Sequence, residues 1–235
     1  MSSINIFMSK DQYLSINSHL KVNNPNLVYS SLTKDLIFKP ENNEEIKKYI
    51  STDKINLLFL SWLTEANINR KSLKQILEAV SLCINACDLN INLTIAGGHG
   101  DAINTINNLI KKYKINKNVE LKVDITIKEK NFLYSKSDLL VTPSKMEGFG
   151  NATLEAMSFG CPSIVSRYGA SPENVGKTGY IINMIEPQYI ADAIIAYSKL
   201  SLEQRLTMRK EAYERAFTVF SFEKRLNKIK RLIIT

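Results

Sequence analysis

Two acidic residues, Glu147 and Glu155, flank a short segment whose residue types suit an anion-binding turn. The segment reads Pro143-Ser144-Lys145-Met146-Glu147-Gly148-Phe149-Gly150-Asn151-Ala152-Thr153-Leu154-Glu155 and follows an apolar run. A strand that ends here, a turn, and a helix that begins near residue 151 would direct free backbone N–H groups and the positive end of the helix dipole into one small volume. Gly148 and Gly150 would permit close backbone approach and unusual φ angles. The segment therefore predicts a diphosphate site.

The two carboxylates indicate what else this site would hold. Glu147 and Glu155 would repel phosphate groups, so in such a site they should accept hydrogen bonds from hydroxyl groups. A diphosphate that carries hydroxyl groups on both sides is a nucleotide sugar. On this interpretation Glu155, inside the helix, faces the ribose, and Glu147, in the loop, faces the donor sugar.

The elements that must position this segment form an alternating pattern of strands and helices. From residue 55 onward, short apolar runs bounded by polar residues, Gly or Pro alternate with stretches of helical periodicity, which predicts βαβ units around a parallel sheet. The predicted strands are 55–61, 91–96, 119–123, 139–142, 163–166 and 180–182, and the predicted helices are 73–84, 101–113, 128–136, 151–159, 186–200, 202–217 and 222–233, with Ser221 as N-cap of the last.

The first fifty residues predict a separate and smaller unit. Residues 4–7 and 27–30 suit strands and residues 11–20 suit a helix, which makes one βαβ unit, too little for an independent domain. Residues 40–43 resemble a linker. The predicted fold class is α/β, with an N-terminal segment at 1–50 and a Rossmann-like domain at 51–235 that ends in a basic helix.

The glycine-containing segment resembles the donor-binding domain of retaining glycosyltransferases of the two-domain GT-B architecture, in particular family 4. The match is Glu147-x7-Glu155 within Pro-Ser-x-x-Glu-Gly-Phe-Gly-x-x-x-Leu-Glu-Ala-Met-x-x-Gly-x-Pro, and the similarity extends over about residues 56–200. It is weaker upstream, where residues 1–50 would be a remnant of the acceptor domain. The resemblance implies glycosyl transfer from an NDP-sugar such as a UDP- or GDP-sugar.

The resemblance also implies roles for particular residues. Lys71, with Arg70 beside it, would bind the donor diphosphate and act in catalysis with Glu147. The alternative is a solvated basic pair at a helix start, but cations there oppose the helix dipole. The remaining donor-binding residues would come from a glycine-rich turn, a position near the nucleobase, and the motif itself: Gly97, Gly98, His99, Val123, Gly148, Phe149, Gly150, Asn151, Ala152 and Glu155. For His99 a solvent-facing position is an equal alternative.

Two positions depart from the family pattern. Ser61-Trp62-Leu63 stands where the family usually has Gly-Arg-Leu, so one expected phosphate ligand is missing and either Arg70 substitutes or donor affinity is reduced. Val123 stands where a glycine usually lies near the nucleobase. Base recognition is therefore left open.

No Asp-x-Asp sequence occurs, and the family usually dispenses with a metal, so we expect neither a metal nor another cofactor. Three hypotheses follow. The chain supplies the donor site of a glycosyltransferase and pairs with an acceptor-binding subunit, it is a non-catalytic nucleotide-sugar-binding module, or it is a basic scaffold for membrane or RNA. The first is favoured because the donor-site residues occur together. No basic motif interleaved with aromatic residues points to nucleic acid.

Composition and charge set the remaining expectations. The chain has 235 residues, 44% apolar and 23% charged, with a formal charge of +8. No apolar run approaches the roughly 20 residues that span a bilayer, and the N-terminus lacks the pattern of a secretory signal; with an odd number of cysteines, this predicts a cytoplasmic protein. Residues 197–235 hold ten Lys or Arg and four Glu. This end could contact anionic lipid, or it is simply a solvated helical face.

Overall fold

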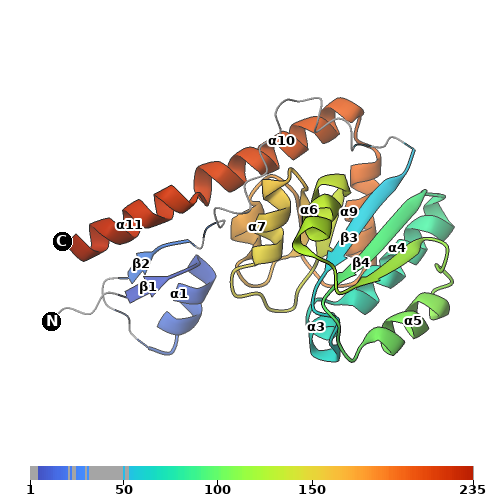
Figure 1. Ribbon diagram of the computed structural model, residues 1–235, viewed down its shortest axis with the longest axis horizontal. Coiled ribbons are helices and arrows are strands. Elements are labelled where there is room, and N and C mark those ends of the chain that lie inside the picture. Colours follow the sequence, from blue (N-terminus) through green and yellow to red (C-terminus); the bar gives the residue numbers. More distant parts are fainter. Residues whose placement is uncertain are drawn as a thin grey trace.

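The computed structural model describes residues 5–20, 22, 25–29, 31, 50 and 53–234, which form a small N-terminal unit and a larger unit built on a six-stranded sheet (Figure 1). The linker expected at residues 40–43 lies outside these ranges.

All six strands of the larger unit run parallel, and their order across the sheet is β5-β4-β3-β6-β7-β8. The first strand of the unit therefore lies in the middle, and the chain winds outward first to one edge and then to the other. Sheets of this kind bind ligands beyond the carboxyl ends of the strands where the winding direction reverses, which here is between β3 and β6. The strands are β3 (Ile55–Leu60), β4 (Ile91–Gly97), β5 (Val119–Val123), β6 (Leu139–Thr142), β7 (Ser163–Ser166) and β8 (Tyr180–Ile182).

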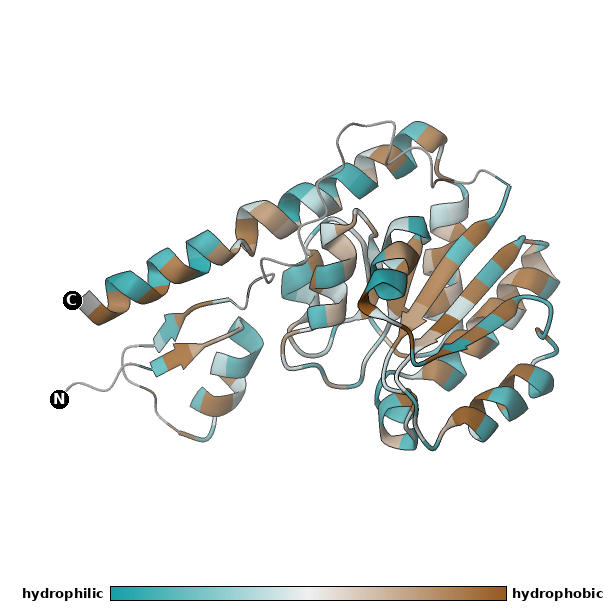
Figure 2. Cartoon of the chain, in the orientation of Figure 1, coloured by the Kyte–Doolittle hydropathy of each residue, from teal (hydrophilic) through white to brown (hydrophobic). Residues whose placement is uncertain are grey.

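Helices cover both faces of this sheet, as a buried parallel sheet requires. Side chains of β3 alternate between the two layers: Leu57 and Phe59 pack with α4, α5 and α9, whereas Leu58 packs with α6 and α7. The central strands are accordingly among the most apolar segments in Figure 2. The helices are α3 (Glu65–Arg70), α4 (Leu73–Cys87), α5 (Ile103–Lys112), α6 (Ile127–Lys136), α7 (Asn151–Ser158), α8 (Ser171–Val175), α9 (Pro187–Ser198), α10 (Leu202–Val219) and α11 (Phe222–Ile234).

The predicted α/β fold with a parallel sheet is confirmed, and all six strands lie where the sequence placed them to within one residue. Two short helices were not predicted. Residues 65–70 form α3, and residues 171–175 form α8. Both are too short to show helical periodicity.

Asp138, at the start of β6, joins three elements inside the larger unit. Its carboxylate accepts from the backbone N–H of Asn56 at 2.7 Å and from the hydroxyl of Tyr197 on α9 at 3.0 Å. Asp138 and Tyr197 are both fully buried. Burial raises the pKa of the Asp138 carboxyl above its ordinary value, although these donors and nearby arginines oppose the shift.

The N-terminal unit consists of β1 (Asn5–Phe7), α1 (Lys10–Asn17) and β2 (Pro25–Leu27), with the two strands parallel. The predicted βαβ unit is therefore present, although its second strand ends at Leu27 rather than beginning there. The carboxylate of Glu173 on α8 accepts from the first N–H groups of α1, at 3.0 Å for Lys10 and 2.9 Å for Asp11. A carboxylate at this end of a helix is favourable, so Glu173 fastens the small unit to the large one.

The two C-terminal helices run along one side of the molecule, from the large unit to the strands of the small one (Figure 1). Helix α10 packs on α7, and Phe220, between the helices, contacts Tyr29 edge to face with ring centroids 5.4 Å apart. Ser221 caps α11 as predicted, accepting from the N–H of Lys224 at 3.2 Å. No helix within the described ranges is both long and apolar enough to span a membrane.

Candidate functional site

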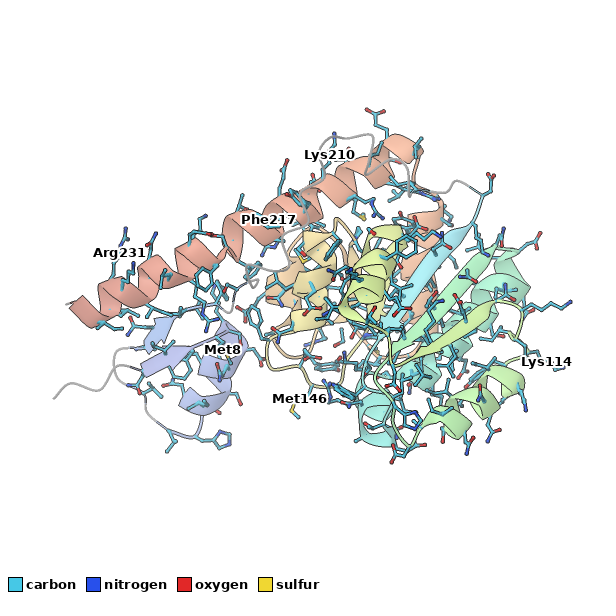
Figure 3. All side chains as sticks on the ribbon, viewed as in Figure 1. Met8, Lys114, Met146, Lys210, Phe217 and Arg231 are labelled. Carbon is cyan, nitrogen blue, oxygen red and sulfur yellow. The ribbon has the colours of Figure 1, made fainter. Side chains whose placement is uncertain are left out.

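A cavity of about 830 Å³ opens at the carboxyl ends of β3, β4 and β6, where the winding of the sheet reverses. Its walls are the segments that leave those strands, the start of α7, part of α6, and Met8 of the small unit, which Figure 3 places on the side that faces the large unit. The lining residues are Met8, Leu60, Ser61, Trp62, Asn67, Arg70, Lys71, Gly97, Gly98, Asp124, Ile125, Lys130, 147–152 and Glu155.

The glycine-containing turn and the N-terminus of α7 form one wall of the cavity. Gly150 is the N-cap residue of α7, with a φ of 82°, and no side chain caps the helix. The first N–H groups of a helix have no partner within it, so those that follow Gly150 are available to a ligand. A Cβ added at Gly148 would meet no atom within 4 Å. The fold itself therefore does not require glycine at 148, whereas a ligand close to the backbone would.

Packing beneath the turn fixes its shape. The buried side chain of Asn174 donates to the carbonyl of Phe149, whose ring packs against Phe220 in the cluster between α7 and α10. Gly169 has a φ of 68°, and a Cβ there would lie 2.8 Å from the backbone nitrogen of Glu147 and nearer still to its carbonyl oxygen. The absence of a side chain at 169 therefore lets the α8 segment support the Glu147 backbone.

Glu147 is held through one of its two carboxylate oxygens. Oε2 accepts from the Arg70 guanidinium at 2.9 Å and from the buried hydroxyl of Ser144 at 3.2 Å. Arg70 also donates to the carbonyl of Met146 at 2.9 Å, so it holds both the backbone of this loop and the side chain of Glu147. Among the described residues no donor contacts Oε1, which leaves that oxygen for a ligand.

Glu155 repeats this arrangement on the other side of the turn. Its Oε2 accepts from Lys130 at 2.8 Å and from the hydroxyl of Tyr134 at 3.1 Å, both on α6. Again no described donor contacts Oε1. Each carboxylate thus has a cation that offsets its charge and one oxygen able to accept from a hydroxyl group.

Lys71 places an ammonium group at the base of the cavity. The residue is 8% exposed, and its Nζ donates to the carbonyl of Leu60, at the end of β3, at 3.0 Å. Burial lowers the pKa of this amine below its ordinary value, since the charged form loses solvation; Glu147 opposes the shift and Arg70 adds to it. A bound anion would stabilise the charged amine in place of the water that burial removes.

The pair of Arg70 and Lys71 lies between two helices. Arg70 is in the last turn of α3, where a cation is favourable for the helix dipole, and Lys71 is the C-cap residue of α3 and directly precedes Ser72, the N-cap residue of α4. The pair thus stands at the start of α4, as predicted, but because its location also suits the end of α3, location alone gives no argument for phosphate binding. What connects both residues to the site is their contact with the cavity.

Of the three residues predicted for the glycine-rich turn at the end of β4, two line the cavity. Gly97 and Gly98 line the cavity, whereas His99 is exposed and lies outside the lining; its backbone N–H donates to the Asp124 carboxylate at 2.7 Å. Val123, the last residue of β5, also lies outside the lining. Asp124, with a φ of 55°, turns the chain so that Asp124 and Ile125 reach the cavity instead.

Several of the lining residues had no predicted role in the site, among them Trp62, Asp124 and Lys130. Trp62, noted only as a departure from a family pattern, is 67% exposed at the cavity. Asp124 and Lys130 come from the segment between β5 and β6. The signal that could have indicated Lys130 is its spacing from Tyr134, since residues four apart share one face of a helix. In the described part of the chain, no group of three or more His, Cys, Asp and Glu side chains could hold a metal.

Comparison with known proteins identifies the family. The family model of the glycosyl transferases group 1 matches residues 41–215. The chain belongs to this family. In this member of the family, the six-stranded unit has the fold of a GT-B C-terminal domain, as the sequence resemblance predicted.

Curated relatives of this chain include N-acetyl-alpha-D-glucosaminyl L-malate synthase of Bacillus anthracis, 29% identical over 202 residues that cover 84% of this chain and 50% of that enzyme. O-antigen chain mannosyltransferase B of Escherichia coli is 28% identical over 134 residues, which cover 57% of this chain and 34% of that enzyme. The chain thus spans half or less of the length of these two relatives.

Solved structures of similar fold include TarM of S. aureus, with a TM-score of 0.78 and 21% identity over 98% of this chain and 43% of that one. Sucrose-phosphate synthase of Thermosynechococcus elongatus has a TM-score of 0.80 and 20% identity, covering 97% of this chain and 57% of that one. TarM was crystallised in a complex containing UDP.

Proposed function

We propose that this chain supplies the donor site of a retaining glycosyltransferase that transfers a hexose-type sugar from an NDP-sugar. The observation that carries the proposal is the cavity that combines the uncapped N-terminus of α7, the buried ammonium of Lys71, and two carboxylates that each keep one free oxygen. The diphosphate faces the helix terminus and Lys71. The free oxygens of Glu147 and Glu155 accept from the hydroxyl groups on either side.

In this proposal the protein promotes cleavage between the sugar C1 and the diphosphate oxygen by stabilising the charge that develops on the leaving diphosphate. Lys71 and the backbone N–H groups near residues 148–151 supply most of that stabilisation, because groups positioned in a shielded site are not reorganised during the reaction. Arg70 is largely engaged with Glu147 and the Met146 carbonyl, so it orients Glu147 and adds positive charge at the same end. No step in this proposal uses a metal.

Acceptor recognition belongs to a second component in this proposal. The matched segments cover half or less of these relatives, and among the described residues of the small N-terminal unit only Met8 lines the cavity. We infer that an acceptor-binding subunit completes the enzyme in the cytoplasm. Transfer to an acceptor only when this subunit is added would support the inference.

Binding of the donor can be followed directly, because Trp62 is the single tryptophan of the sequence and lines the cavity. Titration with UDP and with GDP should change its fluorescence, and calorimetry should give the same dissociation constant. Lys71→Ala and Glu155→Ala should each weaken binding by roughly tenfold or more, since hydrogen bonds to charged groups contribute about 1.5–3 kcal/mol. Equal affinity in the wild type and both variants would refute the site.

Turnover separates the enzyme from the alternative of a non-catalytic binding module. Release of the sugar from an NDP-sugar, in the presence of candidate acceptor subunits, supports the enzyme, and NMR of the product's anomeric proton tests retention. Donor binding without any sugar release or transfer would favour the binding module.

A peripheral membrane contact through α11 is a separate part of the proposal. The helix carries five cations and one acidic residue, and Phe222, Leu226 and Ile233 are at least 36% exposed on it. Basic amphipathic helices of this kind bind anionic bilayers. Co-sedimentation with phosphatidylglycerol vesicles, but not with phosphatidylcholine vesicles, would support the contact, and equal sedimentation after removal of residues 221–235 would exclude it.

A further inference from the structure

Helix α6 directs two donors at one oxygen of Glu155. Lys130 Nζ lies 2.8 Å and Tyr134 Oη lies 3.1 Å from Oε2. The two donors differ in setting, because Tyr134 is fully buried and stacks on Phe159, whereas Lys130 lines the cavity. Burial raises the pKa of the Tyr134 hydroxyl well above its ordinary value. Tyr134 therefore remains a proton donor, and the direct ion pair of Glu155 is made by Lys130.

The start of α6 fixes where these donors lie. Thr126 accepts from the N–H of Glu129 at 3.2 Å, and the Glu129 carboxylate accepts from the N–H of Thr126 at 2.7 Å, which is a complete capping box. The N–H of Lys130 then donates to the Thr126 carbonyl at 2.9 Å, as a first regular helical bond. The capping box thus fixes the backbone position from which the Lys130 side chain extends.

The consequence for Glu155 is a carboxylate of fixed orientation. With Oε2 occupied by two donors, rotation of the carboxylate would cost one charge-assisted bond and one bond to a buried hydroxyl. Oε1 has no described donor, and a carboxylate oxygen can accept two hydrogen bonds. A vicinal diol such as that of a ribose offers two hydroxyl donors, which matches the capacity of Oε1.

We propose that Lys130 is a positioning residue for the nucleotide: together with Tyr134 it holds Glu155 so that the free oxygen accepts from the ribose diol of the donor. The inference rests on the proposed function, since it requires a nucleoside diphosphate in the cavity. Lys130 acts through Glu155 and does not itself contact the diphosphate.

The test compares Lys130→Met, Lys130→Arg and Glu155→Gln in calorimetric titrations with UDP and GDP and with their 2′,3′-dideoxy analogues. Lys128→Met is the matched control, because Lys128 lies exposed on the same helix. We expect the wild type to bind the natural nucleotide about tenfold more tightly than its dideoxy analogue. Lys130→Met and Glu155→Gln should remove most of this preference, Lys130→Arg should retain it, and Lys128→Met should not change it.

A second measurement separates action through Glu155 from direct contact with the ligand. Added to Glu155→Gln, the Lys130→Met change should weaken binding less than threefold, because the two residues belong to one interaction. Additive losses, or equal losses for natural and dideoxy nucleotides, would show that Lys130 meets the diphosphate itself and overturn the inference alone. Failure of the wild type to bind either nucleoside diphosphate would instead overturn the proposed function, and this inference with it.

Discussion

Replacing Gly148 by alanine should weaken nucleotide binding while leaving the protein at least as stable. The added methyl group would meet no atom within 4 Å, and Gly148 is not among the residues with positive φ. The fold should therefore accept alanine. A glycine-to-alanine change at such a position stabilises a protein by about 0.4–1 kcal/mol, because it restricts the unfolded chain.

The expected loss of affinity follows from the position of the residue on the cavity wall. A diphosphate close enough to bind the N–H groups that follow Gly150 would contact the methyl group and lose at least one hydrogen bond. Such bonds to a charged group contribute about 1.5–3 kcal/mol, and 1.4 kcal/mol is a tenfold change in affinity. UDP binding should weaken by roughly ten- to a hundredfold.

Gly169→Ala is the comparison for stability. At a φ of 68° and with its Cβ overlapping the Glu147 backbone, alanine there should lower the free energy of unfolding by about 2–4 kcal/mol. Urea denaturation gives the stability of both variants, and calorimetry with UDP gives the affinity. If Gly148→Ala binds UDP as tightly as the wild type, or unfolds more easily, the reasoning that a ligand requires glycine at 148 is wrong.

Three further predictions concern single contacts. Lys71→Met should raise the melting temperature at pH 7, because it removes a buried charge, and it should abolish UDP binding. In the ligand-free wild type, the free energy of unfolding should rise with pH between the lowered pKa of Lys71 and its ordinary value of 10.5, because in that range only the unfolded chain keeps the proton. This rise should shrink in the variant. Tyr197→Phe should lower the free energy of unfolding in urea by about 1–3 kcal/mol by removing a donor to buried Asp138, whereas Tyr189→Phe, on the same helix but 37% exposed, should have almost no effect. Glu173→Ala should speed proteolysis within the first 30 residues, followed by mass spectrometry, without lowering the melting temperature of the large unit.

The parallel sheet could be predicted because each strand is an apolar run with clear boundaries. The short helix α3 was missed although Thr64 gives it a local N-cap, because it spans only six residues and only Ile68 is buried within it. Its start is also held by the N–H of Glu65, which donates to the Asp101 carboxylate at 2.9 Å. A helix this short has too few buried positions to show helical periodicity.

The candidate site likewise has a part that could be predicted from the sequence and a part that could not. Residues 147–155 could be placed because they are contiguous and combine a loop with a helix start. Lys130 could not be assigned from the sequence in this way: its spacing from Tyr134 predicts only that the two residues share a helix face, and the packing of α6 against α7 is what brings it to Glu155, 25 residues later in the chain. Val123 was placed by counting along the sequence, but the positive φ of Asp124 redirects the chain after the strand, so the neighbouring residues reach the cavity instead.

The reversal of winding between β3 and β6 has a consequence for how such a protein can diversify. Most of the cavity wall in the large unit is built from strand ends, loops and the ends of helices, whereas Leu57 and Leu58 anchor the layers from the strand interior. Most substitutions that alter ligand preference therefore fall outside the strand interiors that hold the layers together. A mutational library scored separately for abundance and for donor choice should yield two nearly disjoint sets of positions, so a new sugar or base can be acquired without first compensating for lost stability.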